Sequence, residues 1–370
     1  MKTDSLVVHA DCQPMEGIAD PLPNQIYRNP RISIEQRELG PLSDNDVRIE
    51  MLYAGICGTD VHLSRQNPDT GYILTTAPLS IPPQGRVIGH EGVGRAIAVG
   101  NNVKHVKPGD YLTFESIVVC GYCDMCRKGR FNQCRHAILL GLEKDGLFST
   151  AADIPGSLAH RIDDLIDSDS DLHALACIEP ASVAYVACQN ARMSGGDKVV
   201  VFGGGPIGLF CAILARTVFG ASEVRVVEPV PFRRRFAEQW CDTSLDIAEF
   251  FDSPPDFVDV VLEATGKMEN VNRIFKRINA GGRVVVLARS GESLTVDATD
   301  HMITNAISIV GSRGHLCGAF TDLISLYRRK RVPLGATITS VSTGLSSLKD
   351  LLGNSDEVLN DNCKILVKLS

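Results

Sequence analysis

Two patterns of hydrophobic positions divide this chain into parts of different character. Over the first 120 residues, apolar and polar positions alternate in short stretches at 31–38, 47–53, 93–99 and 111–119, and Gly or Pro interrupts them. Alternation with a period of two indicates strands that bury one face. This part of the chain therefore predicts an antiparallel, barrel-like β domain.

A different pattern begins near residue 170. Apolar residues at helical spacing over 172–188 are followed by a continuous apolar run at 199–202, a Gly-rich turn and an apolar helix at 209–219. Further apolar strands are predicted at 224–227, 257–262, 283–287 and 306–310. Continuous apolar strands that alternate with helices are typical of a parallel sheet covered on both faces, the doubly wound arrangement.

The two patterns together predict an α/β protein with a β-rich domain and a doubly wound parallel-sheet domain. A length of 370 residues agrees with this, because roughly 150 residues per domain suggests two domains. We place the β-rich domain at 1–180 and the parallel-sheet domain at 181–318. The tail, 319–370, has β segments at 336–341 and 364–369 and is expected to return to the first domain.

Composition and charge argue against several classes of function. A net charge of -7 gives no electrostatic support for a nucleic-acid partner. The uncharged stretch 199–215 is shorter than the roughly 20 residues that span a membrane, and Gly203-Gly204-Gly205-Pro206 would break a helix there. No membrane association is expected. The start Met1-Lys2-Thr3-Asp4 has no apolar region behind it, so we expect a reducing, cytoplasmic location, in which 12 cysteines indicate metal binding, catalysis or packing.

A phosphate-binding motif opens the parallel-sheet domain. Gly203-Gly204-Gly205-Pro206-Ile207-Gly208 fits G-x-G-x-x-G, follows a buried strand and opens an apolar helix. The first glycine allows the tight turn, Gly205 lets a pyrophosphate approach the backbone, and Gly208 allows the helix to pack closely on the strand. Because the helix N-terminus faces the phosphates, this context predicts a dinucleotide site.

The choice between NAD and NADP depends on the end of the second strand. Glu228 lies 20 residues after Gly208, where a carboxylate accepts both ribose hydroxyls and repels a 2′-phosphate. This favours NAD. The run Arg233-Arg234-Arg235 leaves NADP as the less favoured alternative, because these arginines could attract the phosphate or could form the solvated face of the next helix.

A closely spaced group of cysteines predicts a closed metal site. Cys120, Cys123, Cys126 and Cys134 follow the spacing C-x2-C-x2-C-x7-C within a lobe at about 118–136. Four thiolates can close a tetrahedron around one Zn²⁺ and leave no open position, so this zinc would be structural. An iron–sulfur cluster is the minor alternative.

A second set of metal ligands is spread along the chain. Cys57 lies in a Gly-rich stretch, His90 and Glu91 form Gly-His-Glu-Gly, and Glu179 precedes Pro180. One Cys, one His and one or two Glu make a mixed donor set that leaves room for water or substrate, as in catalytic zinc sites.

These ordered motifs resemble the zinc-dependent medium-chain alcohol dehydrogenase superfamily, and within it the polyol and sugar branch, which includes sorbitol, glucose and threonine-type dehydrogenases. The resemblance covers nearly the whole chain. It implies a GroES-like catalytic domain, which precedes and follows a Rossmann domain, and a homodimer or homotetramer. It also implies that Cys57 and His90 are the first two ligands of a catalytic zinc. Glu179 occupies the position of the third ligand, where classical alcohol dehydrogenases use Cys, and Glu91 can bind zinc directly or through water.

The resemblance also assigns roles around the zinc and the cofactor. Asp60 would orient His90, while Thr59 and His62 match the family's proton relay. Thr265 lies at a strand end near the nicotinamide ribose, and Arg313 lies where polyol dehydrogenases often place an arginine in the cleft; we group both, with Arg233, among the cofactor-binding residues.

The implied reaction transfers a hydride between NAD and a secondary alcohol of a polyol, sugar or cyclitol, with two zinc ions per chain. The long segment between His62 and His90 is expected to border the substrate pocket. Its Asp69 could attract an amine, so a dehydrogenase of an amino alcohol is an alternative. A cofactor-binding relative without catalytic activity is a further alternative, which the joint presence of Cys57, His90, Glu179 and Thr59 disfavours.

Overall fold

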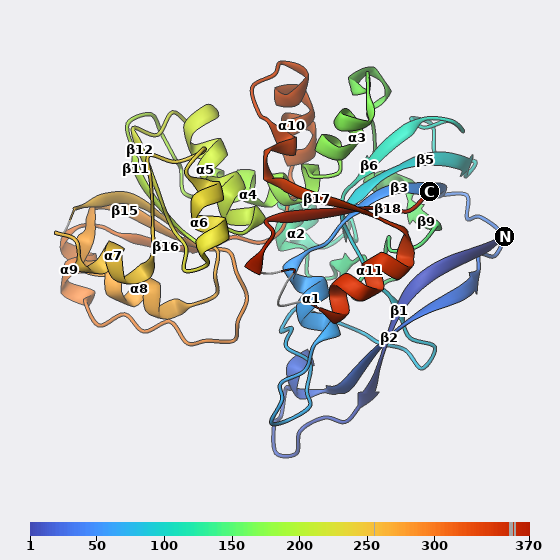
Figure 1. The fold of residues 1–370 in the computed structure, drawn as a ribbon, viewed down its shortest axis with the longest axis horizontal. Coiled ribbons are helices and arrows are strands. Elements are labelled where there is room, and N and C mark those ends of the chain that lie inside the picture. The colour runs from blue at the N-terminus through green and yellow to red at the C-terminus, as the bar shows by residue number, and fades with distance from the viewer. Residues whose placement is uncertain (255, 355–357, 359) are drawn as a thin grey trace. The chain divides into compact units, whose positions relative to one another are not determined.

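The computed structural model describes residues 1–254, 256–354, 358 and 360–370, and it divides into two compact units (Figure 1). Unit 1 comprises Met1–Glu179, Leu334–Leu359 and Lys364–Ser370, and unit 2 comprises Pro180–Pro333 and Asn360–Cys363. The chain thus leaves unit 1, forms most of unit 2 and returns. Helix α10 (Ala319–Arg328), which the sequence analysis grouped with the returning tail, lies in unit 2.

Two sheets form most of unit 1. In the first, β1 (Lys2–Cys12) pairs antiparallel with both β2 (Tyr27–Glu38) and β4 (Arg86–Val87), and β1 and β2 form a long hairpin (Figure 1). The second has the order β10-β6-β5-β3-β18-β17, with β9 paired to β3. Its strands are β3 (Asp46–Gly55), β5 (Gly92–Val99), β6 (Tyr111–Phe114), β9 (Ala151–Pro155), β10 (Ala159–Arg161), β17 (Ile338–Thr343) and β18 (Lys364–Lys368).

The alternation seen in the sequence matches the burial of these strands. Positions along β3 are alternately buried and partly exposed up to Tyr53, as one-sided burial requires. Where a single strand was predicted at 111–119, the chain forms β6 and then β7 (Ile117–Val118), which pairs with β8 (Ile138–Leu139) beside the cysteine lobe. The returning strands β17 and β18 join the sheet of unit 1 next to β3.

Short helices complete unit 1. They are α1 (Gly58–Ser64), α2 (Asp124–Arg127), α3 (Asp169–Leu175) and α11 (Gly344–Gly353). The helix predicted at 172–188 is interrupted after Leu175, and α4 (Ile178–Asn190) begins as the chain passes into unit 2.

Unit 2 is a six-stranded parallel sheet with the order β13-β12-β11-β14-β15-β16. The strands are β11 (Lys198–Phe202), β12 (Glu223–Val227), β13 (Thr243–Leu245), β14 (Val258–Glu263), β15 (Ile278–Val286) and β16 (Ser308–Gly311). The connecting helices include α5 (Pro206–Thr217), α6 (Pro231–Ala237), α7 (Ile247–Asp252), α8 (Met268–Ile274) and α9 (Thr299–Thr304). The predicted fold class is confirmed, and β13 is a strand that the pattern did not predict.

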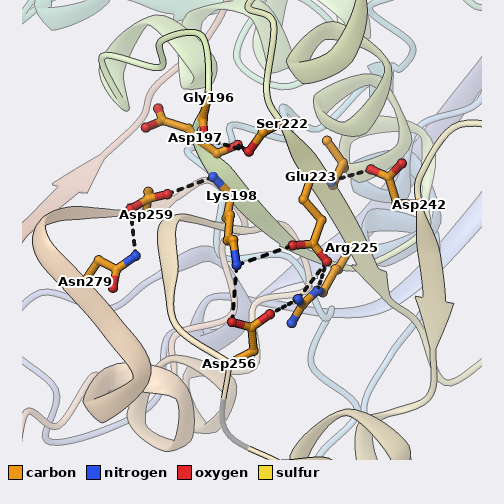
Figure 2. A network of polar contacts seen from close by, with 11 residues as sticks. Gly196, Asp197, Lys198, Ser222, Glu223, Arg225, Asp242, Asp256, Asp259 and Asn279 are labelled. Carbon is orange, nitrogen blue, oxygen red and sulfur yellow. Dashed lines mark hydrogen bonds and ion pairs between the residues drawn. The ribbon is translucent and has the colours of Figure 1, made fainter.

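Charged residues crowd the amino ends of the central strands of this sheet. Figure 2 shows Lys198 and Arg225 surrounded by acidic partners, with Lys198 N donating to Asp259 Oδ2 at 2.8 Å and Arg225 paired with both Glu223 and Asp256. The positive and negative side chains of this group are therefore hydrogen-bond and ion-pair partners of one another. The Gly-rich turn lies at the opposite edge, where parallel strands end and where ligands bind in this architecture.

No helix in the described part of the chain is long and apolar enough to cross a membrane. The uncharged stretch 199–215 forms the buried strand β11, the glycine turn and the buried helix α5.

Candidate functional site

Three of the predicted zinc ligands come together in unit 1. Cys57 lies directly before α1, and His90 and Glu91 lie in the turn between β4 and β5. The ligand atoms of Cys57, His90 and Glu91 are all within 4.8 Å of one another, with His90 and Glu91 buried and Cys57 partly exposed. The chain thus brings a thiol, an imidazole and a carboxylate to one point from two segments more than 30 residues apart.

Asp60 holds this group in place from the first turn of α1. Its Oδ2 accepts a hydrogen bond from Cys57 N at 2.9 Å, and its Oδ1 lies 3.6 Å from His90 Nδ1. Burial alone would lower the pKa of His90, but the charges of Asp60 and Cys57 raise it well above its ordinary value. The surroundings of His90 therefore favour positive charge, which suits a metal cation at its other nitrogen.

A buried lysine is part of the same centre, and the sequence analysis missed it. Lys364 Nζ, at the start of β18, pairs with Glu91 Oε2 and donates to the carbonyl of Ile56 at 2.8 Å. Burial alone would lower the pKa of Lys364, but the charges of Glu91 and then Cys57 raise it above its ordinary value. Gly55 makes this approach possible, since a Cβ there would lie 2.6 Å from Glu91 Oε2.

Glu179 lies near this group but is not among the three ligand atoms that meet within 4.8 Å. Its Oε1 accepts a hydrogen bond from the hydroxyl of Ser116 at 3.0 Å, a partner that the sequence analysis missed. Burial and then the charge of Glu91 raise the pKa of Glu179 to about 7, against the opposing influence of His90. Two carboxylates, a thiol and one imidazole around one buried point fit a divalent cation, which would compensate their charge.

The two residues predicted to form the proton relay lie on α1. Thr59 Oγ1 is 3.8 Å from Cys57 Sγ, so its hydroxyl is next to the candidate ligand. His62 is exposed to solvent. Partial desolvation by neighbouring atoms, and then the charge of Arg65, lower the pKa of its imidazole. Thr59 thus lies beside a candidate ligand and His62 lies at the surface, and the proton relay between them stays a prediction.

The long segment after His62 is hydrogen-bonded to the hairpin region that includes Gln13 and Asn29. Tyr72 Oη donates to the carbonyl of Gln13 at 2.8 Å, and Asn29 N donates to Gly71 O at 2.9 Å. Asp69 is exposed in the turn of this segment. Its position gives no support to an acidic group that would bind an amine.

The four cysteines of the lobe also converge. Their sulfur atoms lie within 4.8 Å of one another, with Cys120 Sγ 3.6 Å from Cys134 Sγ and 4.0 Å from Cys126 Sγ. A tetrahedron with Zn–S bonds of about 2.3 Å has sulfur–sulfur edges of roughly 3.8 Å. The spacing therefore fits a four-thiolate zinc site and is far too long for a disulfide.

We expect replacement of Cys126 by serine to remove zinc from this lobe. Cys126 is buried, and the three cysteines that remain would leave the tetrahedron incomplete. The lobe would then lose the metal that is expected to link α2 to the segment before β8. The free energy of unfolding should fall by at least about 3 kcal/mol, which lowers Tm by roughly 5–10 °C. Metal analysis and calorimetry measure both effects. The control is Cys12→Ser, at an exposed thiol; retention of zinc and Tm in Cys126→Ser would contradict a structural metal here.

The glycine motif forms a tight turn at the carboxyl end of β11. Gly203 N donates to Val227 O at 2.9 Å, and α5 begins with Gly205 as its N-cap and Pro206 in its first turn. A Cβ at Gly208 would lie 1.9 Å from the carbonyl oxygen of Gly203, so only glycine lets the helix pack this closely. Ile207, between them, lies in the first turn of the same helix.

Glu228 lies beside this turn. Its Oε2 accepts from Gly204 N at 2.6 Å and its Oε1 from Val230 N at 2.8 Å. Two of the neighbouring arginines bind carbonyl oxygens: Arg233 Nε donates to Asn362 O at 2.9 Å, and Arg234 Nη1 donates to Glu228 O at 3.0 Å.

Thr265 follows β14 at the same edge of the sheet. A Cβ on Gly203 would lie 3.0 Å from Thr265 Cγ2, so the two turns are in contact. The buried carboxylate of Glu263 organises the second turn, because it accepts hydrogen bonds from Thr265 N and Gly266 N at 2.9 Å each. Arg313 follows β16, also at this edge.

Comparisons with known proteins agree with this arrangement. The family model of the alcohol dehydrogenase GroES-like domain matches residues 43–164, and that of the zinc-binding dehydrogenases matches 206–329. An L-galactonate-5-dehydrogenase of Escherichia coli is 31% identical, with 68% of this chain and 71% of that protein covered. An L-threonine 3-dehydrogenase of Caldanaerobacter subterraneus is 28% identical, with 81% and 84% covered.

A solved structure shares the fold. It is that of 2R,3R-butanediol dehydrogenase from Bacillus subtilis, which has a TM-score of 0.79, 24% identity and complete coverage of both chains. The resemblance inferred from the sequence motifs is confirmed. The chain belongs to the zinc-dependent medium-chain alcohol dehydrogenase superfamily, in its polyol and sugar branch, and is an NAD(P)-linked dehydrogenase.

Proposed function

We propose that this enzyme transfers a hydride between NAD and a secondary hydroxyl group of a polyol, sugar or cyclitol. The observation that carries the proposal is the meeting of Cys57, His90 and Glu91 within 4.8 Å, with the Thr59 hydroxyl beside Cys57. The three relatives named above support the substrate class. Galactonate, threonine and butanediol each carry a secondary hydroxyl next to a carbon with another polar substituent.

Each of these residues would have a separate role in the reaction. Cys57 and His90 would hold a catalytic zinc, with Glu179 or Glu91 as a further ligand. When bound, zinc polarises the hydroxyl oxygen of the substrate and lowers the pKa of that hydroxyl. The Thr59 hydroxyl then receives the proton and passes it to His62, which reaches solvent. Asp60 keeps Cys57 and His90 oriented throughout.

Backbone groups and side chains of unit 2 would together hold the cofactor. The turn from Gly203 to Gly208 and the N-terminus of α5 would bind the pyrophosphate. Thr265 and its turn would contact the nicotinamide ribose at the carboxyl edge of the sheet, and the nicotinamide would supply the hydride acceptor.

A substrate panel tests the proposed function. Alditols, aldoses, cyclitols, simple secondary alcohols and L-threonine are each supplied with NAD, and the appearance of NADH is followed by absorbance. We expect turnover of alditols, aldoses or cyclitols to exceed that of simple alcohols and of threonine. Turnover confined to simple alcohols would refute the polyol assignment, and preference for threonine would favour the amino-alcohol alternative.

We also propose that NAD is preferred over NADP. Support comes from the Glu228 carboxylate, which is buried against the glycine turn, and from the engagement of Arg233 and Arg234 with carbonyl oxygens. Glu228→Gln removes the negative charge and keeps one oxygen acceptor for the turn. It should raise kcat/KM for NADP roughly tenfold, the effect of about 1.4 kcal/mol of charge repulsion. The control is Glu223→Gln at the opposite end of β12; an unchanged ratio of NADP to NAD in Glu228→Gln would contradict the assignment.

Three further expectations stay predictions. They are two zinc ions per chain, a homodimer or homotetramer, and a cytoplasmic location. Metal analysis and light scattering of the purified protein measure the first two.

A further inference from the structure

A serine and a glutamate from distant parts of unit 1 are hydrogen-bonded to each other beside the candidate metal ligands. Ser116 Oγ donates to Glu179 Oε1 at 3.0 Å, and the two residues are only 4% and 7% exposed. Burial and then the charge of Glu91 raise the pKa of Glu179, and the charge of His90 lowers it. The carboxylate that Ser116 holds is therefore within electrostatic reach of two candidate ligands.

The backbone fixes Ser116 on both sides. Ser116 lies in the link between β6 and β7, where Glu115 N donates to Leu158 O at 2.9 Å. The carbonyl oxygen of Ser116 accepts a hydrogen bond from Leu140 N, also at 2.9 Å. The next two residues form β7, which pairs with β8 beside the cysteine lobe. The hydroxyl of Ser116 is therefore presented to Glu179 from a position that neighbouring strands determine.

The side chain of Glu179 has more freedom than its backbone. Glu179 is the second residue of α4, so the helix fixes its Cα, but several rotatable bonds separate the Cα from the carboxylate. Ordering a glutamate side chain at the moment of metal binding would cost conformational entropy. The hydrogen bond from Ser116 fixes one carboxylate oxygen in advance, and with it the orientation of the group.

The other candidate ligands have supporting groups of the same kind. Asp60 contacts both the thiol-bearing residue and the imidazole, and Lys364 Nζ pairs with Glu91 Oε2. Such groups orient a metal ligand without binding the metal, and their loss weakens metal binding. In the same arrangement, Ser116 is the supporting group of Glu179.

We propose that Ser116 is a positioning residue of the catalytic zinc site, which holds the carboxylate of Glu179 in the orientation that binds the metal. This inference rests on the proposed function, because it assigns a further residue to the same site. Ser116 acts through Glu179 and needs no contact of its own with the metal or the substrate.

Metal binding tests the proposal without turnover. Metal-free protein is titrated with Zn²⁺ in competition with a chromophoric chelator, and Cys57→Ala identifies the binding step that belongs to this site and not to the cysteine lobe. In Ser116→Ala the Zn²⁺ affinity of this step should fall roughly 10- to 100-fold, the loss typical of removing a group that orients a ligand. The visible absorption bands of Co²⁺ bound at the same site should also change, because they depend on the coordination geometry.

Matched variants make the result specific to this hydroxyl. Ser149 is another buried serine of unit 1, and its hydroxyl donates to the carbonyl of Ala151. Ser149→Ala should therefore leave the Zn²⁺ affinity and the Co²⁺ bands unchanged. Ser116→Gly also lacks the hydroxyl and should show the same loss as Ser116→Ala, whereas Ser116→Thr keeps a donor and should retain most of the affinity.

A double variant shows whether Ser116 acts through Glu179. Glu179→Ala removes the carboxylate, so adding Ser116→Ala to it should lower the Zn²⁺ affinity by no more than about twofold. A merely structural role of Ser116 would give the same loss with and without Glu179. That result, or wild-type affinity and wild-type Co²⁺ bands in Ser116→Ala, would overturn the proposal.

These measurements also separate the inference from the proposed function. If no alcohol in the substrate panel is oxidised, the proposed function fails, but a lower Zn²⁺ affinity that depends on Glu179 still supports the role of Ser116. If polyols are oxidised and Ser116→Ala binds both metals as the wild type does, the proposed function stands and the role of Ser116 is refuted.

Discussion

Replacing Cys57 with alanine is expected to reduce kcat/KM by on the order of 10³-fold or more and to lower the zinc content by one ion per chain. The thiol is one of the three donors that meet within 4.8 Å, and Thr59 lies against its sulfur. Without the thiolate, the remaining donors neither balance the charge of the cation nor fix its coordination geometry. The reaction then loses several kcal/mol of transition-state stabilisation. Steady-state kinetics and metal analysis of the same preparation measure both effects.

Two further variants help to explain the loss of activity and zinc expected for Cys57→Ala. Asp60→Asn keeps all the ligands but weakens the support of Cys57 and His90, so a loss of roughly 10- to 100-fold in metal affinity or activity is expected. Cys12→Ala, at an exposed thiol, should match the wild type. Full activity and full zinc content in Cys57→Ala would show that the catalytic centre lies elsewhere.

Replacing Lys364 with methionine is expected to lower the free energy of unfolding by about 3–5 kcal/mol. Lys364 and Glu91 are each only 1% exposed, and Lys364 Nζ also binds the carbonyl of Ile56. The apolar side chain would leave the Glu91 carboxylate buried without its partner, which is the unfavourable outcome of breaking a buried ion pair. Urea unfolding followed by circular dichroism measures the change in metal-free protein.

The double variant Lys364→Met, Glu91→Gln shows whether the pair itself is responsible. It removes both charges and should regain most of the lost stability, because the remaining amide needs no cation. Lys364→Met with wild-type stability, or a double variant that is no more stable than the single one, would contradict a buried pair at this position. In zinc-loaded protein the metal should recover part of the loss, since Zn²⁺ can also compensate Glu91.

Much of the architecture could be read from local patterns. The alternation over 47–53 indicates that one face of β3 is buried. The continuous apolar run at 199–202 indicates that both faces of β11 are buried. The first strand of the long hairpin, β1, was not among the alternating stretches identified in the sequence; it spans Lys2–Cys12, where Asp4 and His9 interrupt the alternation. The break between α3 and α4 was missed because apolar spacing continues across it.

The candidate metal ligands could be recognised in the sequence, because Cys, His and Glu at these spacings are typical of metal sites. Four cysteines within 15 residues can only close a compact loop, and Gly-His-Glu-Gly places two donors next to each other. The partners of these donors were not recognisable. Ser116 lies 63 residues from Glu179, and Lys364 lies 273 residues from Glu91, at the start of an apolar strand that carries no sign of a functional lysine.

The sequence by itself determined the fold class, the dinucleotide turn and the set of possible metal donors, because periodicity, glycine spacing and ligand spacing are local properties. Only the tertiary structure decided which donors meet and how they are compensated. Pairing of β18 with β3 brings Lys364 to Glu91, although the two residues are 273 positions apart in the sequence. The physical reason is that the charge of a buried group is set by its spatial neighbours, and strand pairing selects those neighbours from distant parts of the chain.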